Sequence, residues 1–468
     1  MYQMNPQNSP GPVFEANPQN SSGAAVSRFR WVICALLFFS TTVNYLDRQV
    51  ISYLKDEFFC VPAANGGFGW SNSDYSNLTA AFTGVYAAAT IFAGWFIDKI
   101  GTKLGLALSL ITWSFFGFLN AFIGSAIRMH MIIRSFFAVG EAGNFPASIK
   151  TVAEWFPKRE RAFATAIFNA GSNGGAMIAA IFVPWCMIYF GAALGWKMAF
   201  MITGIGGLLW LPFWFWLYDP PDKHRKLSRA EYDYIHIDDE TQADAKNGDK
   251  ARKLSWWKVL KFPQLWAFLA GKFMTDGIWW FYLFWLPDYL HKQFGMTKAQ
   301  IMMPTFIVYG VAIIGSVYGG SIPMTLIKRG MAVYAARMTT MLIIALCPLA
   351  VLLTQYFGDV SRFGHSAAVL AVAMICIGAT AHQAWSANLF TTVSDMFPKK
   401  AVASVVGLGT AAGGAGGVIL QKVPGWLTDH LPTQTAYLIM FIICALSYMV
   451  AWSIMKALVP RHRPITDL

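Results

Sequence analysis

The chain has 468 residues, of which 56% are hydrophobic and only 13% are charged, and its mean hydropathy is +0.45. A typical soluble domain is about 25% charged, so this composition excludes a soluble globular protein, a disordered chain, a coiled coil and a small disulfide scaffold as the main architecture. The net charge of +12 does not indicate nucleic-acid binding, because the cations lie between long apolar runs and not on one amphipathic face. We therefore predict an all-α membrane protein.

Twelve apolar runs are each long enough to cross a bilayer as a helix, which takes about 20 residues. A long polar stretch separates the first six runs from the last six. The runs cover residues 31–54, 74–97, 104–124, 129–150, 161–190, 195–217, 264–290, 299–326, 332–357, 364–393, 401–421 and 434–458.

This pattern predicts five segments. Residues 1–27 are rich in Asn, Pro and Ser and read as a disordered cytoplasmic tail. A six-helix bundle over 28–217, a cytoplasmic loop over 218–261 and a second six-helix bundle over 262–458 follow, and 459–468 forms a short cytoplasmic tail. We expect a monomer whose surroundings are the lipid bilayer.

The distribution of Lys and Arg predicts the orientation. The segments on the side of both termini hold 26 of these residues, whereas the opposite loops hold 7. Long loops obey the positive-inside rule poorly, but without the 10 cations of the central loop the difference is still 16 against 7. Both termini are therefore expected in the cytoplasm.

An internal repeat supports two equivalent halves. The segment 154–159 (Glu-Trp-Phe-Pro-Lys-Arg) matches 395–400 (Asp-Met-Phe-Pro-Lys-Lys), and the same offset of 241 residues places Gly175 opposite Gly416. Parallel six-helix repeats occur in transporters whose site lies at mid-membrane between the halves. The offset also places Glu141 opposite His382.

The segment between the second and third runs resembles the loop signature of the major facilitator superfamily. Its residues are Gly94, Asp98, Lys99, Gly101 and Lys103. Glycines allow close helix approach, and Asp98 can pair across the cytoplasmic interface, so these five residues are candidate gating residues.

Five further segments are similar to the anion:cation symporter family, most of all to its hexuronate branch. That family includes bacterial hexuronate, galactonate and glucarate carriers. The segments are Asn44-Tyr-Leu-Asp-Arg48, the stretch from Arg134 through Glu141 to Pro146, Glu154-Trp-Phe-Pro157, Phe168-Asn-Ala-Gly-Ser-Asn-Gly174 and His382-Gln-Ala-Trp-Ser386.

The resemblance implies a secondary active transporter of the inner, or plasma, membrane that imports a sugar-acid anion by proton symport with alternating access. A hexuronate is the expected substrate; galactonate, glucarate or another organic anion, sodium coupling and a passive facilitator remain alternatives. A membrane sensor is disfavoured because the chain offers no signalling domain. Nothing in the sequence resembles a zinc site, a nucleophile elbow or a Walker loop, so we expect neither an enzyme nor a metal or other cofactor.

Four charged residues inside the apolar runs are the main candidates for function, because charges within a bilayer are costly and usually functional. Arg48 is the expected anchor for the substrate carboxylate, since its guanidinium stays charged and matches a carboxylate. Glu141 is the expected proton carrier, with Asp47 as the second titrating group. Arg134 lies two helical turns from Glu141 on the same face and is expected to couple to it.

A sugar acid also needs hydroxyl partners and an apolar surface. Tyr86 and Trp385 fall where related sugar-acid carriers place binding aromatics. Besides Arg48, the candidate substrate-binding residues are Tyr45, Tyr86, Asn169, Tyr282, His382, Gln383, Trp385 and Ser386. Asn173 and Trp279 are two further candidates.

Lys272 and Asp276 form a second charged pair in the seventh run. They are four residues apart and can neutralise each other on one helix face. The alternative is that Lys272 is a second cation for a dicarboxylate or a long sugar acid.

Overall fold

A computed structural model describes residues 28–236, 259–397, 399–461 and 465. The predicted tail 1–27 lies outside the described residues, as do parts of the central loop and of the C-terminal tail.

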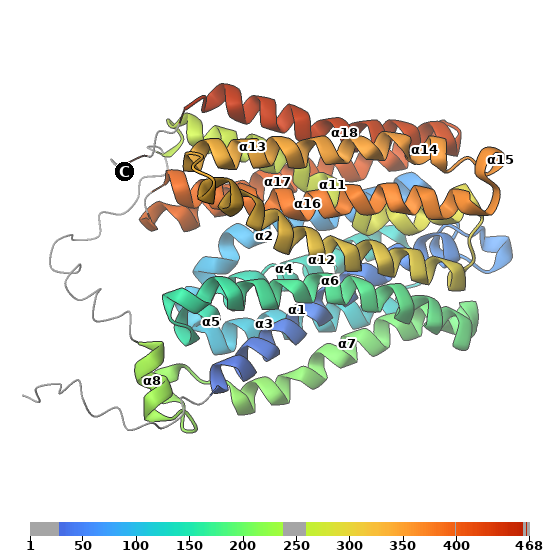
Figure 1. Ribbon diagram of the computed structural model, residues 1–468. Helices are drawn as coiled ribbons and strands as arrows, with labels where there is room; N and C mark the ends of the chain where they lie inside the picture. The colour runs from blue at the N-terminus through green and yellow to red at the C-terminus, as the bar shows by residue number, and fades with distance from the viewer. Residues whose placement is uncertain (1–27, 237–258, 398, 462–464, 466–468) are drawn as a thin grey trace, which may run out of the picture.

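Within the described residues, twelve helical segments follow the twelve predicted runs, and two of them are interrupted (Figure 1). Short helices α8 (Arg229–Ile235) and α15 (Val360–Phe363) lie between them. The first six segments are α1 (Phe29–Leu54), α2 (Asn72–Ile100), α3 (Thr102–Leu119), α4 (Ile127–Glu141) with α5 (Asn144–Trp155), α6 (Lys158–Tyr189) and α7 (Gly191–Leu217). The last six are α11 (Pro263–Phe294), α12 (Lys298–Lys328), α13 (Val333–Leu346) with α14 (Thr354–Phe357), α16 (Ala367–Met396), α17 (Lys399–His430) and α18 (Thr433–Leu458).

Nine of the described helical segments are long and apolar enough on their own to cross a membrane. The other three of the twelve are α4 with α5, α11 and α17. Helix α4 has only 15 residues before the chain turns, α11 contains Lys272, Asp276 and Asp288, and α17 is rich in glycine.

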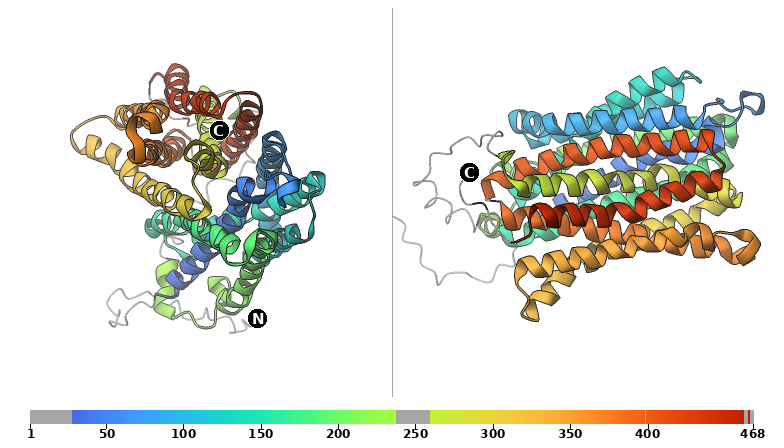
Figure 2. Two further views of the ribbon diagram at one scale, coloured as in Figure 1. Left: turned by 90° about the vertical axis from the view of Figure 1, so that its right-hand side faces the viewer. Right: turned by 90° about the horizontal axis from the view of Figure 1, so that it is seen from above.

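The helices form two bundles that lie side by side (Figure 2). We call α1–α7 the N half and α11–α18 the C half. Helices α2 and α17 pack together across the interface between the halves, as do α6 and α12. We call the face where α1 begins and α18 ends the terminal face, and the face that carries residues 60–71 the distal face (Figure 1).

The two glycines that the repeat aligns occupy equivalent packing positions. A Cβ atom on Gly175 of α6 would lie 2.3 Å from the carbonyl oxygen of Thr42 on α1. A Cβ atom on Gly416 of α17 would lie 2.0 Å from the carbonyl oxygen of Phe273 on α11. Both glycines thus let the fifth segment of a half contact the first segment of the same half, as expected for two copies of one unit.

The fourth segment breaks directly after Glu141. Pro146 lies in the first turn of α5, where a helix does not need its missing N–H group, and this position favours the break because in a continuous helix its ring would crowd the carbonyl group of Ala142. Gly140 and Gly143 bring this break against α3: a Cβ atom on Gly143 would lie 2.0 Å from Oγ of Ser109. The break therefore fixes the end of α4 that carries Glu141.

Candidate functional site

The centre of the candidate site is an ion pair between α1 and α4. Nε of Arg48 donates to Oε2 of Glu141 at 3.0 Å, and both side chains are almost completely buried. The two residues are 93 positions apart in the chain. Because α1 and α4 both belong to the N half, this pair does not require the C half.

Four aromatic rings surround the guanidinium of Arg48. Its Cζ atom lies 4.4 Å from the ring centroid of Tyr45, 4.7 Å from that of Tyr86, 5.4 Å from that of Phe82 and 5.1 Å from that of Trp280. Rings at these distances attract a cation through their electron-rich faces. Trp280 lies on α11, so Arg48 sits at the interface between the two halves.

Arg134, which is expected to couple to Glu141, acts on it electrostatically, while its hydrogen bond goes to α1. Its Nη2 atom donates to the carbonyl oxygen of Arg48 at 3.3 Å, and its Cζ lies 4.5 Å from the ring centroid of Phe137. Arg48 reaches Glu141 from the neighbouring helix, whereas the side chain of Arg134 is directed to the backbone of α1. Arg134 thus ties α1 to α4 beside the ion pair.

Asp47 points away from Arg48, into the interior of the N half. Adjacent residues on a helix are about 100° apart around its axis, so the two charges of the Asp-Arg pair face different surroundings. The Asp47 carboxylate is buried beside Thr203 of α7 and Trp113 of α3.

These four charged side chains are incompletely hydrogen-bonded within the protein. Among the described residues, no partner is found for either carboxylate oxygen of Asp47, for Oε1 of Glu141, for Nη2 of Arg48, or for Nε and Nη1 of Arg134. Buried polar groups are normally paired, and an unpaired one indicates a functional or solvated site. The cluster can therefore accept protons on its carboxylates and bind an anion on its guanidinium groups.

His382 belongs to a second cluster, within the C half. Its Nδ1 atom lies 2.8 Å from the hydroxyl oxygen of Tyr448, and its ring stacks on Trp279 with the centroids 5.2 Å apart. Gln383 and Ser386 are half-buried on the same helix, α16. Glu141 and His382, which the sequence repeat aligns, thus each belong to a polar cluster in their own half.

Tyr282 and Trp385 lie in the interior of the C half. The Oη atom of Tyr282 would be 2.6 Å from a Cβ atom on Gly378 of α16. Trp385 is fully buried, and its ring meets that of Tyr448 edge to face at 5.5 Å. Both therefore pack helices of the C half together.

Asn169 and Asn173 lie one turn apart on α6. Asn169 is half-buried, and Oδ1 of the buried Asn173 has no hydrogen-bond partner among the described residues. Helix α6 packs against both α1 and α12. The two amides are therefore carried by a helix that contacts both halves.

Lys272 and Asp276 form the predicted pair within α11. Nζ of Lys272 lies 2.6 Å from Oδ2 of Asp276 and 4.6 Å from the ring centroid of Phe390. Lys272 is buried, and Asp276 presses on α17, where a Cβ atom on Gly413 would lie 2.1 Å from Oδ2.

The candidate gating residues lie at the terminal face between α2 and α3. Gly101 has a φ of +88°, which suits glycine at this turn. Nζ of Lys103 pairs with Oδ1 of Asp219 at 2.7 Å, while Lys99 and Gly94 lie near the exposed end of α2. The side chain of Asp98 lies outside the part of the chain that is described, so its predicted pairing stays a prediction.

Phe82 and Trp280, two of the four rings around Arg48, are not among the site residues predicted from the sequence. Phe82 precedes Tyr86 by one turn on α2, so helical spacing from Tyr86 could have indicated it. Trp280 directly follows the candidate Trp279, and the rotation of α11 about its axis decides which of the two rings faces Arg48.

A model of the Major Facilitator Superfamily matches residues 37–421. The chain belongs to the major facilitator superfamily. The family and its curated relatives are membrane transporters and not enzymes.

Curated relatives within this superfamily carry names of sugar-acid transporters. The chain is 28% identical over 431 residues to the hexuronate transporter of Escherichia coli (strain K12), which covers 92% of this chain and 95% of the relative. It is 31% identical over 303 residues to the galacturonate transporter of Dickeya chrysanthemi, with 64% and 83% covered. It is 24% identical to the D-galactonate transporter of Escherichia coli O6:H1, with 92% and 96% covered.

Solved structures of the superfamily share the fold. The crystal structure of a D-xylose-proton symporter gives a TM-score of 0.69 at 15% identity and covers 93% of this chain and all of that one. A bacterial homolog of the human lysosomal transporter Spinster, in an inward-facing conformation, gives 0.67 at 17% identity, with 92% and 98% covered. These likenesses confirm the predicted two-bundle architecture.

Proposed function

We propose that the protein imports a sugar-acid anion, with a hexuronate as its main substrate, by proton symport and alternating access. The observation that carries the proposal is the buried Arg48–Glu141 pair, which is surrounded by aromatic rings and left partly unsatisfied. A guanidinium beside aromatic faces suits an acid with one carboxylate and an apolar sugar face.

Competition for Arg48 gives a simple mechanism of coupling. While Glu141 is ionised, its Oε2 atom occupies Nε of Arg48. Protonation of Glu141 removes the negative charge from this pair and leaves the guanidinium to the substrate carboxylate. Substrate and proton are then carried together, and Asp47, buried without a partner among the described residues, is the second proton site.

Hydroxyl groups of the substrate need further partners. Tyr45 and Tyr86 lie beside Arg48 and offer hydroxyl groups from the N half. We assign the C-half contacts to His382, Gln383 and Ser386 of α16. Asn169 of α6 is the remaining amide candidate.

The names of the relatives support a hexuronate, since they include a hexuronate and a galacturonate transporter. Relatives named for D-galactonate and for galactarate/D-glucarate keep these acids as alternatives. The orientation rests on the excess of Lys and Arg on the terminal face, which we place in the cytoplasm of a bacterial cell, with the distal face outside the inner membrane. We expect the protein to act as a monomer.

Uptake into proteoliposomes tests this function. Glucuronate, galacturonate, galactonate and glucarate are offered with an inwardly directed proton gradient in sodium-free buffer. We expect glucuronate or galacturonate to accumulate and a protonophore to abolish the accumulation. Accumulation that appears only when a sodium gradient replaces the proton gradient would show sodium coupling, and equilibration without accumulation would show passive transport.

A further inference from the structure

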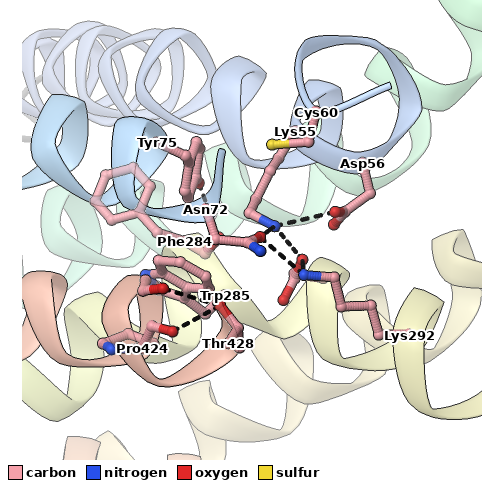
Figure 3. A network of polar contacts seen from close by, with 12 residues as sticks. Lys55, Asp56, Cys60, Asn72, Tyr75, Phe284, Trp285, Lys292, Pro424 and Thr428 are labelled. Carbon is pink, nitrogen blue, oxygen red and sulfur yellow. Dashed lines mark hydrogen bonds and ion pairs between the residues drawn. The ribbon is translucent and has the colours of Figure 1, made fainter. Parts of the chain in front are cut away.

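A cluster of charged and polar side chains joins the two halves at the distal face (Figure 3). The distal cluster consists of Lys55, Asp56, Asn72, Asp288 and Lys292. The fully buried Nζ of Lys55 pairs with the Asp288 carboxylate and donates to Oδ1 of Asp56 at 3.0 Å and to Oδ1 of Asn72 at 2.7 Å. Nζ of Lys292 lies 3.0 Å from Oδ1 of Asp288 and donates to Oδ1 of Asn72 at 2.8 Å.

The cluster is divided between the halves. Lys55 and Asp56 follow α1 and Asn72 begins α2, whereas Asp288 and Lys292 lie on α11. Separation of the halves at the distal face must therefore break the Lys55–Asp288 pair and the Lys292–Asn72 hydrogen bond. Removing one partner of a buried ion pair is strongly unfavourable because it leaves an uncompensated charge.

The charges are distributed so that each half of the cluster stays electrically neutral when the halves separate. In the N half Lys55 keeps Asp56, and in the C half Asp288 keeps Lys292 and the hydroxyl group of Tyr437. Each half of the cluster therefore retains one cation and one anion when the halves part. The bond across the interface can break without leaving a net charge on either side.

Two further contacts close the same face. The carboxylate of Asp429 on α17 accepts hydrogen bonds from the backbone N–H groups of Asn72 and Ser73 at 3.2 and 2.8 Å, at the positive end of α2. Nζ of Lys298 on α12 lies 3.2 Å from Oε2 of Glu57.

An aromatic layer separates the distal cluster from Arg48. Nζ of Lys55 lies 5.5 Å from the ring centroid of Tyr75, whose hydroxyl group donates to the carbonyl oxygen of Phe284 at 2.8 Å. Phe284 stacks on Trp280, which contacts Arg48. Arg48 and Lys55 are seven residues apart, about two helical turns or roughly 10 Å.

We propose that the distal cluster is the outer gate of the transporter and that the Lys55–Asp288 pair holds the outside closed. Alternating access, on which this proposal rests as part of the proposed function, then requires this pair to break whenever the site opens outward. The relative stability of the closed and separated clusters sets how often the outside opens.

The test uses a cysteine that is buried while the gate is closed. Ser76 is buried one turn after Asn72, on the α2 surface that meets Gly425 of α17, where a Cβ atom would lie 2.3 Å from its Oγ. Ser76→Cys is introduced with Cys60 replaced by Ser, and its labelling by a membrane-impermeant maleimide is measured from the outer side of oriented vesicles. The background without Ser76→Cys gives the labelling of the other cysteines.

We expect Asp288→Asn and Lys55→Gln each to raise the labelling rate by about tenfold or more, the effect of a shift of about 1.4 kcal/mol in the opening equilibrium. The double variant Lys55→Asp with Asp288→Lys places two anions in one half and two cations in the other, so it should label at or below the parent rate. The matched control is Asp359→Asn, because Asp359 pairs with Arg362 at 3.0 Å near the same face but within the C half.

An unchanged rate in Asp288→Asn and Lys55→Gln, or an equal rise in Asp359→Asn, would overturn the proposal. So would a double variant that labels as fast as the single variants, because that result indicates general loosening of the fold. The labelling rate needs neither substrate nor a proton gradient. It therefore tests the gate separately from uronate uptake, which tests the proposed function.

Discussion

Glu141 on α4 is paired with Arg48 on α1 at 3.0 Å, although Arg134 lies two turns earlier on its own helix. The cation that holds the candidate proton carrier is thus the candidate substrate anchor. Proton and substrate are therefore linked through one guanidinium, and this arrangement leads to a specific pH dependence.

Substrate affinity should depend on pH through Glu141. As the pH rises, Glu141 ionises and holds Arg48, so the Kd for glucuronate should increase; as the pH falls, protonated Glu141 releases Arg48 and binding should tighten. In Glu141→Gln, which carries no charge at any pH, the Kd should be nearly constant and close to the low-pH value of the parent. Equilibrium binding of glucuronate to purified protein over a pH series measures the Kd of the parent and of the variant.

The same variant should separate binding from coupling. Glu141→Gln is expected to exchange labelled for unlabelled glucuronate across vesicles but not to accumulate it against a gradient. Asp233→Asn, which alters an exposed pair with Arg229, is the control and should accumulate normally. Accumulation by Glu141→Gln would contradict its role as proton carrier.

Gly175→Ala and Gly416→Ala should destabilise the two halves to a similar degree. Each new Cβ atom would meet a carbonyl oxygen of the first helix of its half, at 2.3 and 2.0 Å. Overpacking of this kind typically costs about 1–3 kcal/mol. Thermal unfolding in detergent measures the effect, and Gly206→Ala is the control because a Cβ atom there meets nothing within 4 Å among the described residues. If all three variants unfolded alike, the close approach of these helices would not limit stability.

Lys272 and Asp276 should act as a self-neutralising pair. Lys272→Gln and Asp276→Asn each leave one buried charge without its partner, so each should lower the melting temperature more than the double variant Lys272→Met with Asp276→Leu. The ratio of glucarate to glucuronate uptake should stay constant in all three. A selective loss of glucarate uptake in Lys272→Gln would identify Lys272 as a second anion site.

Glu231 of α8 should stabilise the start of α1. Its carboxylate accepts hydrogen bonds from the backbone N–H groups of Phe29 and Arg30 and pairs with Nη1 of Arg30 at 3.0 Å. Glu231→Gln should lower the stability of the N half by about 1–2 kcal/mol, measured by thermal unfolding. The control is Asp233→Asn, because Asp233 forms an exposed pair with Arg229 that should contribute about 0.5 kcal/mol or less. Equal effects of the two variants would contradict the capping role.

The sequence predicts the helices well because their signal is local. A run of apolar residues determines a span wherever it lies, and the repeat places Gly175 and Gly416 correctly as counterparts. Charges such as Arg48 and Glu141 are conspicuous in such runs for the same reason.

Contacts between helices depend on the rotation of each helix about its axis, which no local pattern fixes. The sequence therefore favours Tyr282 and Trp279 on α11, whereas Trp280 is the residue that contacts Arg48. It also predicts that Arg134 is coupled to Glu141, but it does not show that Arg48 of the neighbouring helix is the ion-pair partner of Glu141. The Lys55–Asp288 pair joins residues 233 positions apart. Asp288 lies inside the predicted run 264–290, so the rule that identified Lys272 could have identified it as well.

Equilibrium binding of glucuronate to Arg48→Gln, at a pH where the parent protein binds it tightly, tests the central claim most directly. The control is Arg362→Gln, which removes an exposed guanidinium from the short helix α15 at the distal face. We predict that the Kd for Arg48→Gln rises by about tenfold or more, which corresponds to at least about 1.4 kcal/mol, while the control keeps the parent value. Parent-like binding by a folded Arg48→Gln protein would contradict the assignment of Arg48 as the substrate anchor.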